Sequence, residues 1–163
     1  MIRRLIVTSV LAVLGAAAMA PKANAQSIDV PFTGTVGGAC TFSGLTPGKL
    51  ATEAPGDLNG LYSYTNGGTD GKVSISCNRA SSLKVSKPVQ TQGPQFTPTT
   101  YLAEARDPSG KYTYISQNGS GAPLTIATST NPIPLRIRMK FYSRSSLTPG
   151  TYGFKTTLTV TPR

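Results

Sequence analysis

A strict alternation of apolar and polar residues between Ile133 and Phe141 is the clearest pattern in the chain. Apolar side chains occupy every odd-numbered position, and proline or a cation occupies each position between them. Because successive side chains point to opposite faces of a strand, this pattern predicts a strand with one buried and one solvated face, as in antiparallel sheets. The apolar positions are Ile133, Leu135, Ile137, Met139 and Phe141.

Two further alternating stretches lie towards the two ends of the chain. Residues 28–32 place Ile28, Val30 and Phe32 on one face of a short predicted strand. Residues 152–160 predict a strand that belongs to the core, with the cations and hydroxyls facing outward. Its expected inward side chains are Tyr152, Phe154, Leu158 and Val160, and its outward ones are Lys155, Thr157 and Thr159.

Shorter alternating runs fill the middle of the chain and are separated by turn signals. Sequences such as Asn66-Gly67-Gly68 and Asp107-Pro108-Ser109-Gly110 favour turns, since proline presets φ and glycine or asparagine tolerates positive φ. No convincing amphipathic helix is found after residue 25. Several short strands with frequent turns predict an all-β fold, a β-sandwich of roughly seven or eight strands.

The first 25 residues have the features of a secretory signal peptide. Two arginines precede an apolar stretch over residues 5–18, and Ala23-Asn24-Ala25 fits a cleavage site with small residues. An uncleaved membrane anchor is the alternative, but the apolar stretch is short and wrongly flanked for a span. We therefore expect an exported protein with a signal peptide (1–25), an N-terminal strand-like segment (26–34) and one β-domain (35–163).

Charge and cysteine content change this picture little. The chain without its first 25 residues has 13 basic and six acidic residues, a net charge of +7, and the charges are dispersed. Such a balance favours solubility over a nucleic-acid site. Cys40 and Cys77 are the two cysteines of the chain. In an oxidising compartment they are expected to form one disulfide, which closes a loop of 37 residues.

The sequence offers little for catalysis. The chain has no histidine, which excludes Ser–His and Cys–His nucleophiles and argues against a zinc site. A pair of carboxylates could serve a hydrolase, but all six acidic residues stand in or beside turn-rich segments, where carboxylates commonly form turns. We expect no enzyme activity, no metal and no cofactor. The acidic residues are Asp29, Glu53, Asp57, Asp70, Glu104 and Asp107.

Three cations share one face of the predicted strand 133–141. Arg136, Arg138 and Lys140 are spaced by two residues, so their side chains point the same way. They form either the solvated face of the sandwich or a shallow binding stripe for an anionic ligand.

Several segments, taken in order, resemble the small pilus subunits of chaperone–usher systems, in particular the archaic branch with spore coat protein U-like domains. They cover most of the chain after the signal peptide. The segments are 30–36 (VPFTGTV), 40–42 (CTF), 73–77 (VSISC), 147–152 (LTPGTY) and 158–160 (LTV).

The resemblance implies an immunoglobulin-like sandwich that lacks its last strand. A periplasmic chaperone would fill the resulting groove first, and the N-terminal strand of the next subunit would replace it at an outer-membrane usher. The donor residues would be Ile28, Val30 and Phe32, and strand 152–160 would border the groove. Two features depart from the family pattern: Pro31 lies within the donor stretch, and the end Thr161-Pro162-Arg163 lacks an aromatic residue.

The leading hypothesis from the sequence is therefore a non-catalytic subunit of a surface fibre. Its partners would be copies of itself or related subunits, and it would pass through the periplasm to the cell surface, with no membrane span and no nucleic acid. The alternative is a self-complete secreted β-sandwich that binds an anionic glycan through the three cations. A hydrolase with paired carboxylates is the third hypothesis.

Overall fold

The computed structural model describes residues 31, 33–35, 37–54 and 58–163. The chain divides into two units, Met1–Thr35 and Val36–Arg163, and the elements below all belong to the second. The predicted signal peptide and the three predicted donor residues, Ile28, Val30 and Phe32, lie outside the described residues. The described part is all-β, and no helix in it is long and apolar enough to cross a membrane.

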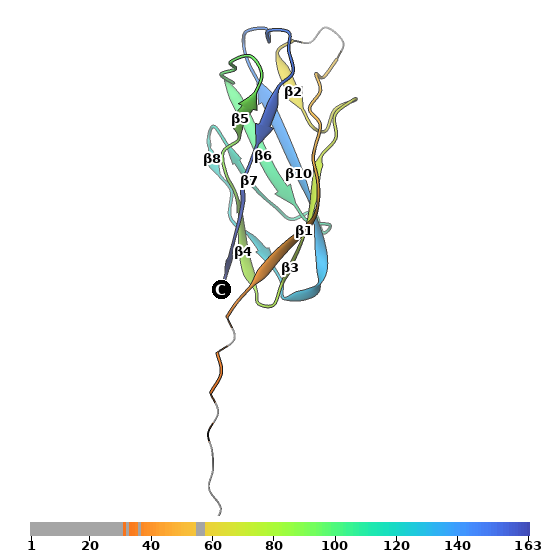
Figure 1. The fold of residues 1–163 in the computed structure, drawn as a ribbon. Helices are drawn as coiled ribbons and strands as arrows, with labels where there is room; N and C mark the ends of the chain where they lie inside the picture. Colours follow the sequence, from red (N-terminus) through yellow and green to blue (C-terminus); the bar gives the residue numbers. More distant parts are fainter. Residues whose placement is uncertain (1–30, 32, 36, 55–57) are drawn as a thin grey trace, which may run out of the picture. The chain divides into compact units, whose positions relative to one another are not determined.

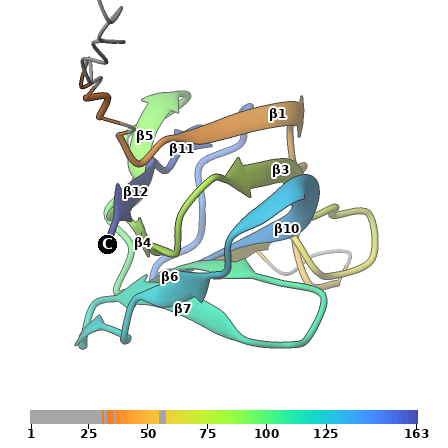
Figure 2. The same ribbon diagram turned by 90° about the horizontal axis from the view of Figure 1, so that it is seen from below.

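The larger of the two layers is an antiparallel sheet with β1 at one edge (Figures 1 and 2). Its strands follow the order β1-β3-β10-β6-β7-β8. The short strand β2 stands outside this order and also pairs with β10. The bounds are β1 Cys40–Thr46, β2 Gly60–Tyr62, β3 Gly71–Cys77, β6 Thr100–Arg106, β7 Tyr112–Ser116, β8 Gly119–Ser120 and β10 Ser129–Tyr142.

The second layer consists of two short ladders that follow one another along the same chain segments. One ladder has the order β12-β4-β9, and the other pairs β11 with β5. The bounds are β4 Ser81–Val85, β5 Val89–Gln92, β9 Leu124–Ile126, β11 Gly153–Lys155 and β12 Leu158–Pro162.

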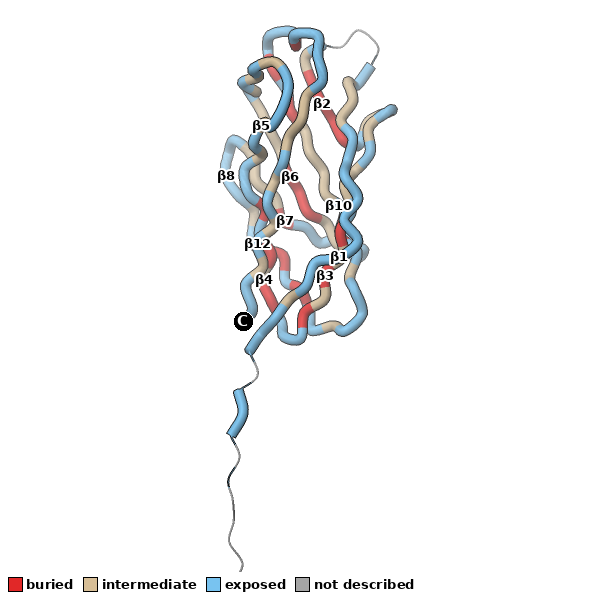
Figure 3. Tube along the Cα trace, in the orientation of Figure 1, coloured by how far each residue is buried: buried red, intermediate tan, exposed pale blue. Residues whose placement is uncertain are grey.

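The core lies between the two layers and confirms a β-sandwich (Figure 3). One cluster combines Val73 and Ile75 of β3 and Leu135 of β10 with Leu83 of β4 and Ile126 of β9. Both sheets therefore contribute to the same apolar interior. A second cluster, at the end of the sandwich near β2, is built on Leu61, Phe141 and Leu147.

The expected disulfide is present between Cys40 and Cys77, with an S–S distance of 2.10 Å. The two residues are direct partners in the ladder, so the bond joins the first residue of β1 to the last residue of β3. It thereby holds the edge strand β1 against the sheet.

Cys77→Ser is expected to lower stability and the yield of exported protein, because removal of a native disulfide from a small secreted domain costs about 2–5 kcal/mol. Thermal denaturation and the amount of protein exported check this. Thiol titration of the unfolded, unreduced wild type serves as the control. Two reactive thiols per chain in that control would contradict the disulfide.

The structure has more strands than the sequence predicts, and one predicted strand is interrupted. The predicted strand 152–160 is divided into β11 and β12 at Thr156 and Thr157. At this point the Ser86 hydroxyl accepts a hydrogen bond from the Thr157 backbone N–H at 2.8 Å, and the Thr156 hydroxyl donates to the Ser86 carbonyl at 2.7 Å. Hydrogen bonds that involve side chains thus replace part of the backbone ladder at this point. Pro88, two positions after Ser86, has no N–H that it could donate to the ladder.

Candidate binding groove

The sandwich is open along one side, between β1 and the strands β11 and β12. Within the described chain, β1 pairs with β3 alone, β11 with β5 alone and β12 with β4 alone. Each of these strands therefore presents an edge whose backbone N–H and C=O groups have no strand beside them. Figure 2 shows β1 and β12 at the edges of the two layers.

A groove of about 1250 Å³ lies between these two edges. Its rims are residues 42–50, which comprise most of β1 and the following loop, and residues 150–158, which include β11. Apolar side chains from the interior of the sandwich reach its floor, among them Leu61, Val73 and Met139. The groove therefore exposes part of the core where a closed sandwich would have another strand.

The two edges meet at one end of the groove. Gly38, just before β1, lies so close to the end of β12 that a Cβ atom on it would be 2.6 Å from the Pro162 Cβ. Asn78 holds this part of the chain, since its Oδ1 accepts a hydrogen bond from the Ala39 N–H at 2.7 Å. The groove consequently begins beyond this contact, along Phe42 and Leu158.

A β-bulge in β1 turns two apolar side chains towards the groove. Ser43 pairs with Ser74 and Thr46 with Lys72, so β1 has one residue more than β3 between these pairs. Gly44 lies in this bulge and has a φ of +62°, a conformation that glycine adopts without strain. As a result Phe42 and Leu45 both line the groove, although they are an odd number of positions apart in the sequence. They remain 38% and 76% exposed.

The opposite rim has the alternation that the sequence indicates. Tyr152 and Phe154 are half-buried against the cluster near β2, and Leu158 and Val160 against the larger cluster. The Phe154 ring stacks on Phe141 with centroids 4.0 Å apart. The outward positions Lys155, Thr157 and Thr159 are exposed.

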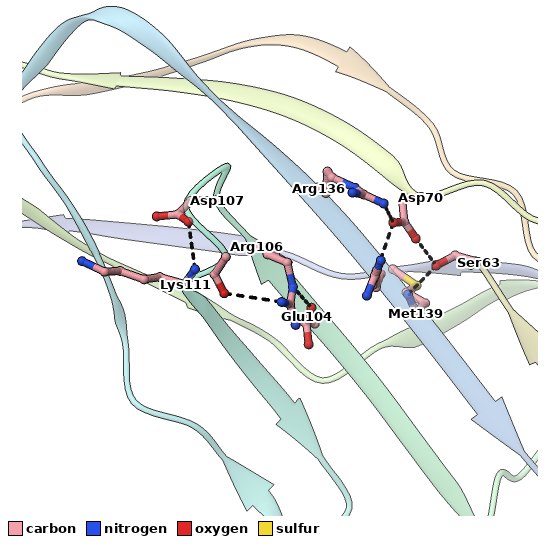
Figure 4. Close-up of polar contacts among 10 residues, drawn as sticks. Ser63, Asp70, Glu104, Arg106, Asp107, Lys111, Arg136 and Met139 are labelled. Atoms are coloured by element: carbon pink, nitrogen blue, oxygen red, sulfur yellow. Dashed lines mark hydrogen bonds and ion pairs between the residues drawn. The ribbon is translucent and has the colours of Figure 1, made fainter. Parts of the chain in front are cut away.

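Asp70 organises the face on which the three predicted cations lie (Figure 4). Arg136 and Arg138 both donate to its Oδ2, at 3.1 and 3.0 Å. The Ser63 hydroxyl donates to its Oδ1 at 2.8 Å and accepts a hydrogen bond from the Met139 N–H at 3.0 Å. Only 7% of the Asp70 side chain is exposed. Two of the three cations therefore share one buried carboxylate, which offsets one of their two positive charges.

Lys140, the third cation, lies on the same strand and contacts an aromatic ring. Its Nζ is 5.5 Å from the centroid of Tyr62, and Arg138 lies in the same way over Tyr64, at 5.6 Å. Burial raises the pKa of the Tyr64 phenol, and the Glu53 carboxylate raises it further. Tyr64 therefore stays neutral at physiological pH.

The turn assignment of Glu104 is wrong. Glu104 lies inside β6, opposite Arg138 and Tyr114, and its Oε1 accepts a hydrogen bond from Arg106 Nε at 2.8 Å. This hydrogen bond raises the pKa of Arg106. Asp107, by contrast, does form a turn, because its Oδ1 accepts the Lys111 N–H at 2.9 Å (Figure 4).

Two features of the site were missed in the sequence. Asp70 looks like a turn residue locally, and only the strand pairing shows that two arginines meet it. The bulge in β1 does have a local signal, since an isolated glycine within a strand pattern suggests a bulge.

Comparison of the chain with protein-family models, with curated proteins and with solved structures gives no match. Within the residues that the structure describes, no three histidine, cysteine or acidic side chains are placed to hold a metal ion.

Proposed function

We propose that this protein is a structural subunit of a surface fibre that is assembled by strand addition. In this proposal, residues 26–34 of one copy enter the groove of the next copy and lie between β1 and β11–β12. The observation that carries the proposal is the open side of the sandwich, where two strand edges flank an apolar groove.

The groove suits an extended peptide better than a compact small molecule. Two rims of nine residues each offer backbone groups for a ladder, and the floor offers apolar contacts for alternate side chains. Ile28, Val30 and Phe32 have the required period of two. Full burial is worth about 1.5–3 kcal/mol for each side chain before ordering costs are subtracted.

Insertion of this kind joins different surfaces of the two copies, so the assembly continues as a fibre and does not close as a dimer would. The resemblance to archaic chaperone–usher subunits adds the route: export, a periplasmic chaperone on the groove, an outer-membrane usher, and a place at the cell surface. Pro31 cannot donate a ladder hydrogen bond, so in this proposal the inserted strand is held by its remaining backbone groups and by its apolar side chains.

The alternative function, binding of an anionic glycan through Arg136, Arg138 and Lys140, has less support. The hydrogen bonds of both arginines to Asp70 reduce the positive charge that a ligand would meet. We therefore retain the fibre subunit as the function that the geometry supports best.

Purified protein that starts at residue 26 is expected to form a series of oligomers in the absence of a chaperone. The reason is that each copy carries both a free N-terminal segment and a groove. Size-exclusion chromatography with light scattering, and electrophoresis of unboiled samples, would reveal a ladder of multiples of one subunit. A stable monomer at all concentrations would favour the glycan-binding alternative.

A further inference from the structure

The described residues that line the groove carry positive charge and no negative charge. They include Lys49 and Lys72 on the β1 side and Lys155 on the β11 side, and no carboxylate. The described acidic residues nearest in the sheet are already engaged: Asp70 binds two arginines and Glu104 binds Arg106. An arriving strand with an acidic residue would therefore be favoured over one with a basic residue.

Lys155 is the lysine best placed to meet such a strand. It lies on β11, between the half-buried residues Phe154 and Thr156, and its own side chain is exposed. Within the described chain it takes part in no ion pair. A strand that pairs with the free edge of β11 would place its outward side chains beside this ammonium group.

The N-terminal segment contains one matching charge. Asp29 is the sole charged residue between Gln26 and Ala39, and it stands between Ile28 and Val30. If these apolar neighbours face the groove floor, the period of two turns the Asp29 carboxylate outward, to the side of Lys155.

The contact between Asp29 and Lys155 does not depend on one exact register of the N-terminal strand against β11. The outward positions of the rim around Lys155 are Gly153 and Thr157, neither of which is charged. Whichever of the three stands opposite Asp29, the lysine lies directly across or one diagonal position away. Long side chains interact over both separations.

We infer that Asp29 and Lys155 form an ion pair between successive copies, and that this pair selects the N-terminal strand of a second copy as the occupant of the groove. The inference rests on the proposed function and adds the partner-selecting contact to it. Residues 26–34 number nine, as many as the rim 150–158, so the length of the segment also fits.

Charge reversal at either position tests the pair. Asp29→Lys places a cation beside Lys155, and Lys155→Glu places an anion beside Asp29. In the chain from residue 26 onward, each variant alone is expected to raise the concentration needed for half-maximal assembly by about two- to thirtyfold. High salt should reduce this difference, because the pair is solvent-exposed.

A mixture of the two variants gives the most specific result. The basic N-terminal segment of the Asp29→Lys variant can enter the acidic groove of the Lys155→Glu variant. The unchanged Asp29 of the Lys155→Glu variant can in turn enter the groove of the Asp29→Lys variant, which keeps Lys155. Equimolar mixing should therefore restore assembly, with the two variants alternating along the fibre.

Lys84→Glu is the matched control for the charge reversals. This exposed lysine faces outward from neighbouring β4 and does not line the groove. The substitution should therefore neither impair assembly nor rescue Asp29→Lys.

The outcomes separate the inference from the proposed function. If wild type assembles and each single reversal assembles equally well, the ion pair is overturned and the proposed fibre subunit is not affected. Wild type that stays monomeric would overturn both. Impaired single reversals whose equimolar mixture also fails to assemble would overturn the contact between copies. Circular dichroism and melting temperature of each variant establish that it is folded.

Discussion

Deletion of residues 26–32 leaves a folded, disulfide-bonded monomer that no longer assembles. This result is expected because the core clusters of the described residues consist of side chains of the unit Val36–Arg163, and the proposed function assigns the apolar face of 28–32 to the groove of another copy. Light scattering should report a single subunit at every concentration. The melting temperature should stay within a few degrees of that of wild-type monomer.

A companion variant tests the same prediction without shortening the chain. Replacement of Ile28, Val30 and Phe32 by serine keeps the length of the segment and should abolish assembly as completely as the deletion does. A deletion variant that fails to fold would show that the stretch is an ordinary first strand of its own domain, because its side chains would then have been removed from its own core.

Leu158→Asp is expected to prevent accumulation of folded protein. Leu158 pairs with Val85 in the β12–β4 ladder and packs against the larger core cluster. The substitution loses part of the roughly 1.5–3 kcal/mol that full burial of a leucine is worth, and it brings a carboxylate against apolar side chains, which costs several kcal/mol more. Together these losses approach the whole stability of a typical domain, about 5–15 kcal/mol.

The adjacent residue supplies the control for this variant. Thr159→Asp introduces the same carboxylate one position further along β12, where the side chain is exposed, and should change the melting temperature little. Export yield and thermal denaturation of the two variants are to be compared. Equal accumulation of Leu158→Asp and wild type would show that the inward register of this strand is wrong.

The parts of the fold that could be predicted are those with a strong local signal. Strand β10 contains the whole predicted stretch 133–141, because five alternating apolar positions define one buried face. The disulfide followed from the number of cysteines and from the expected export. The alternation along 152–160 indicated which side chains pack inward even though the ladder is interrupted there.

Other elements depend on contacts that no local pattern encodes. Strand β6 contains Ala103, Glu104 and Ala105, which favour helices in isolation, yet both alanines are fully buried in the sandwich. The sheet between β10 and β7 determines their conformation, and propensity is overridden. Asp70 is a similar case, since its two arginine partners come from a strand more than sixty residues away.

The groove itself could be inferred from the sequence only through a resemblance. Its existence depends on which strands lie at the edges of the two layers, and strand order is a property of the tertiary structure. Residues 42–50 and 150–158 are about one hundred positions apart, and nothing local indicates that they face each other. The sequence did indicate that residues 152–160 are amphipathic.

Addition of a synthetic peptide of residues 26–34 to the deletion variant tests the central claim most directly. A peptide that binds the folded state alone stabilises it by mass action, by about 2.7 kcal/mol at a concentration one hundred times its Kd. For a domain of this size the melting temperature should then rise by about 10 °C, in proportion to the logarithm of peptide concentration. A peptide with serine at positions 28, 30 and 32 should have no effect. A folded deletion variant whose melting temperature is the same with and without the native peptide would contradict strand addition into the groove.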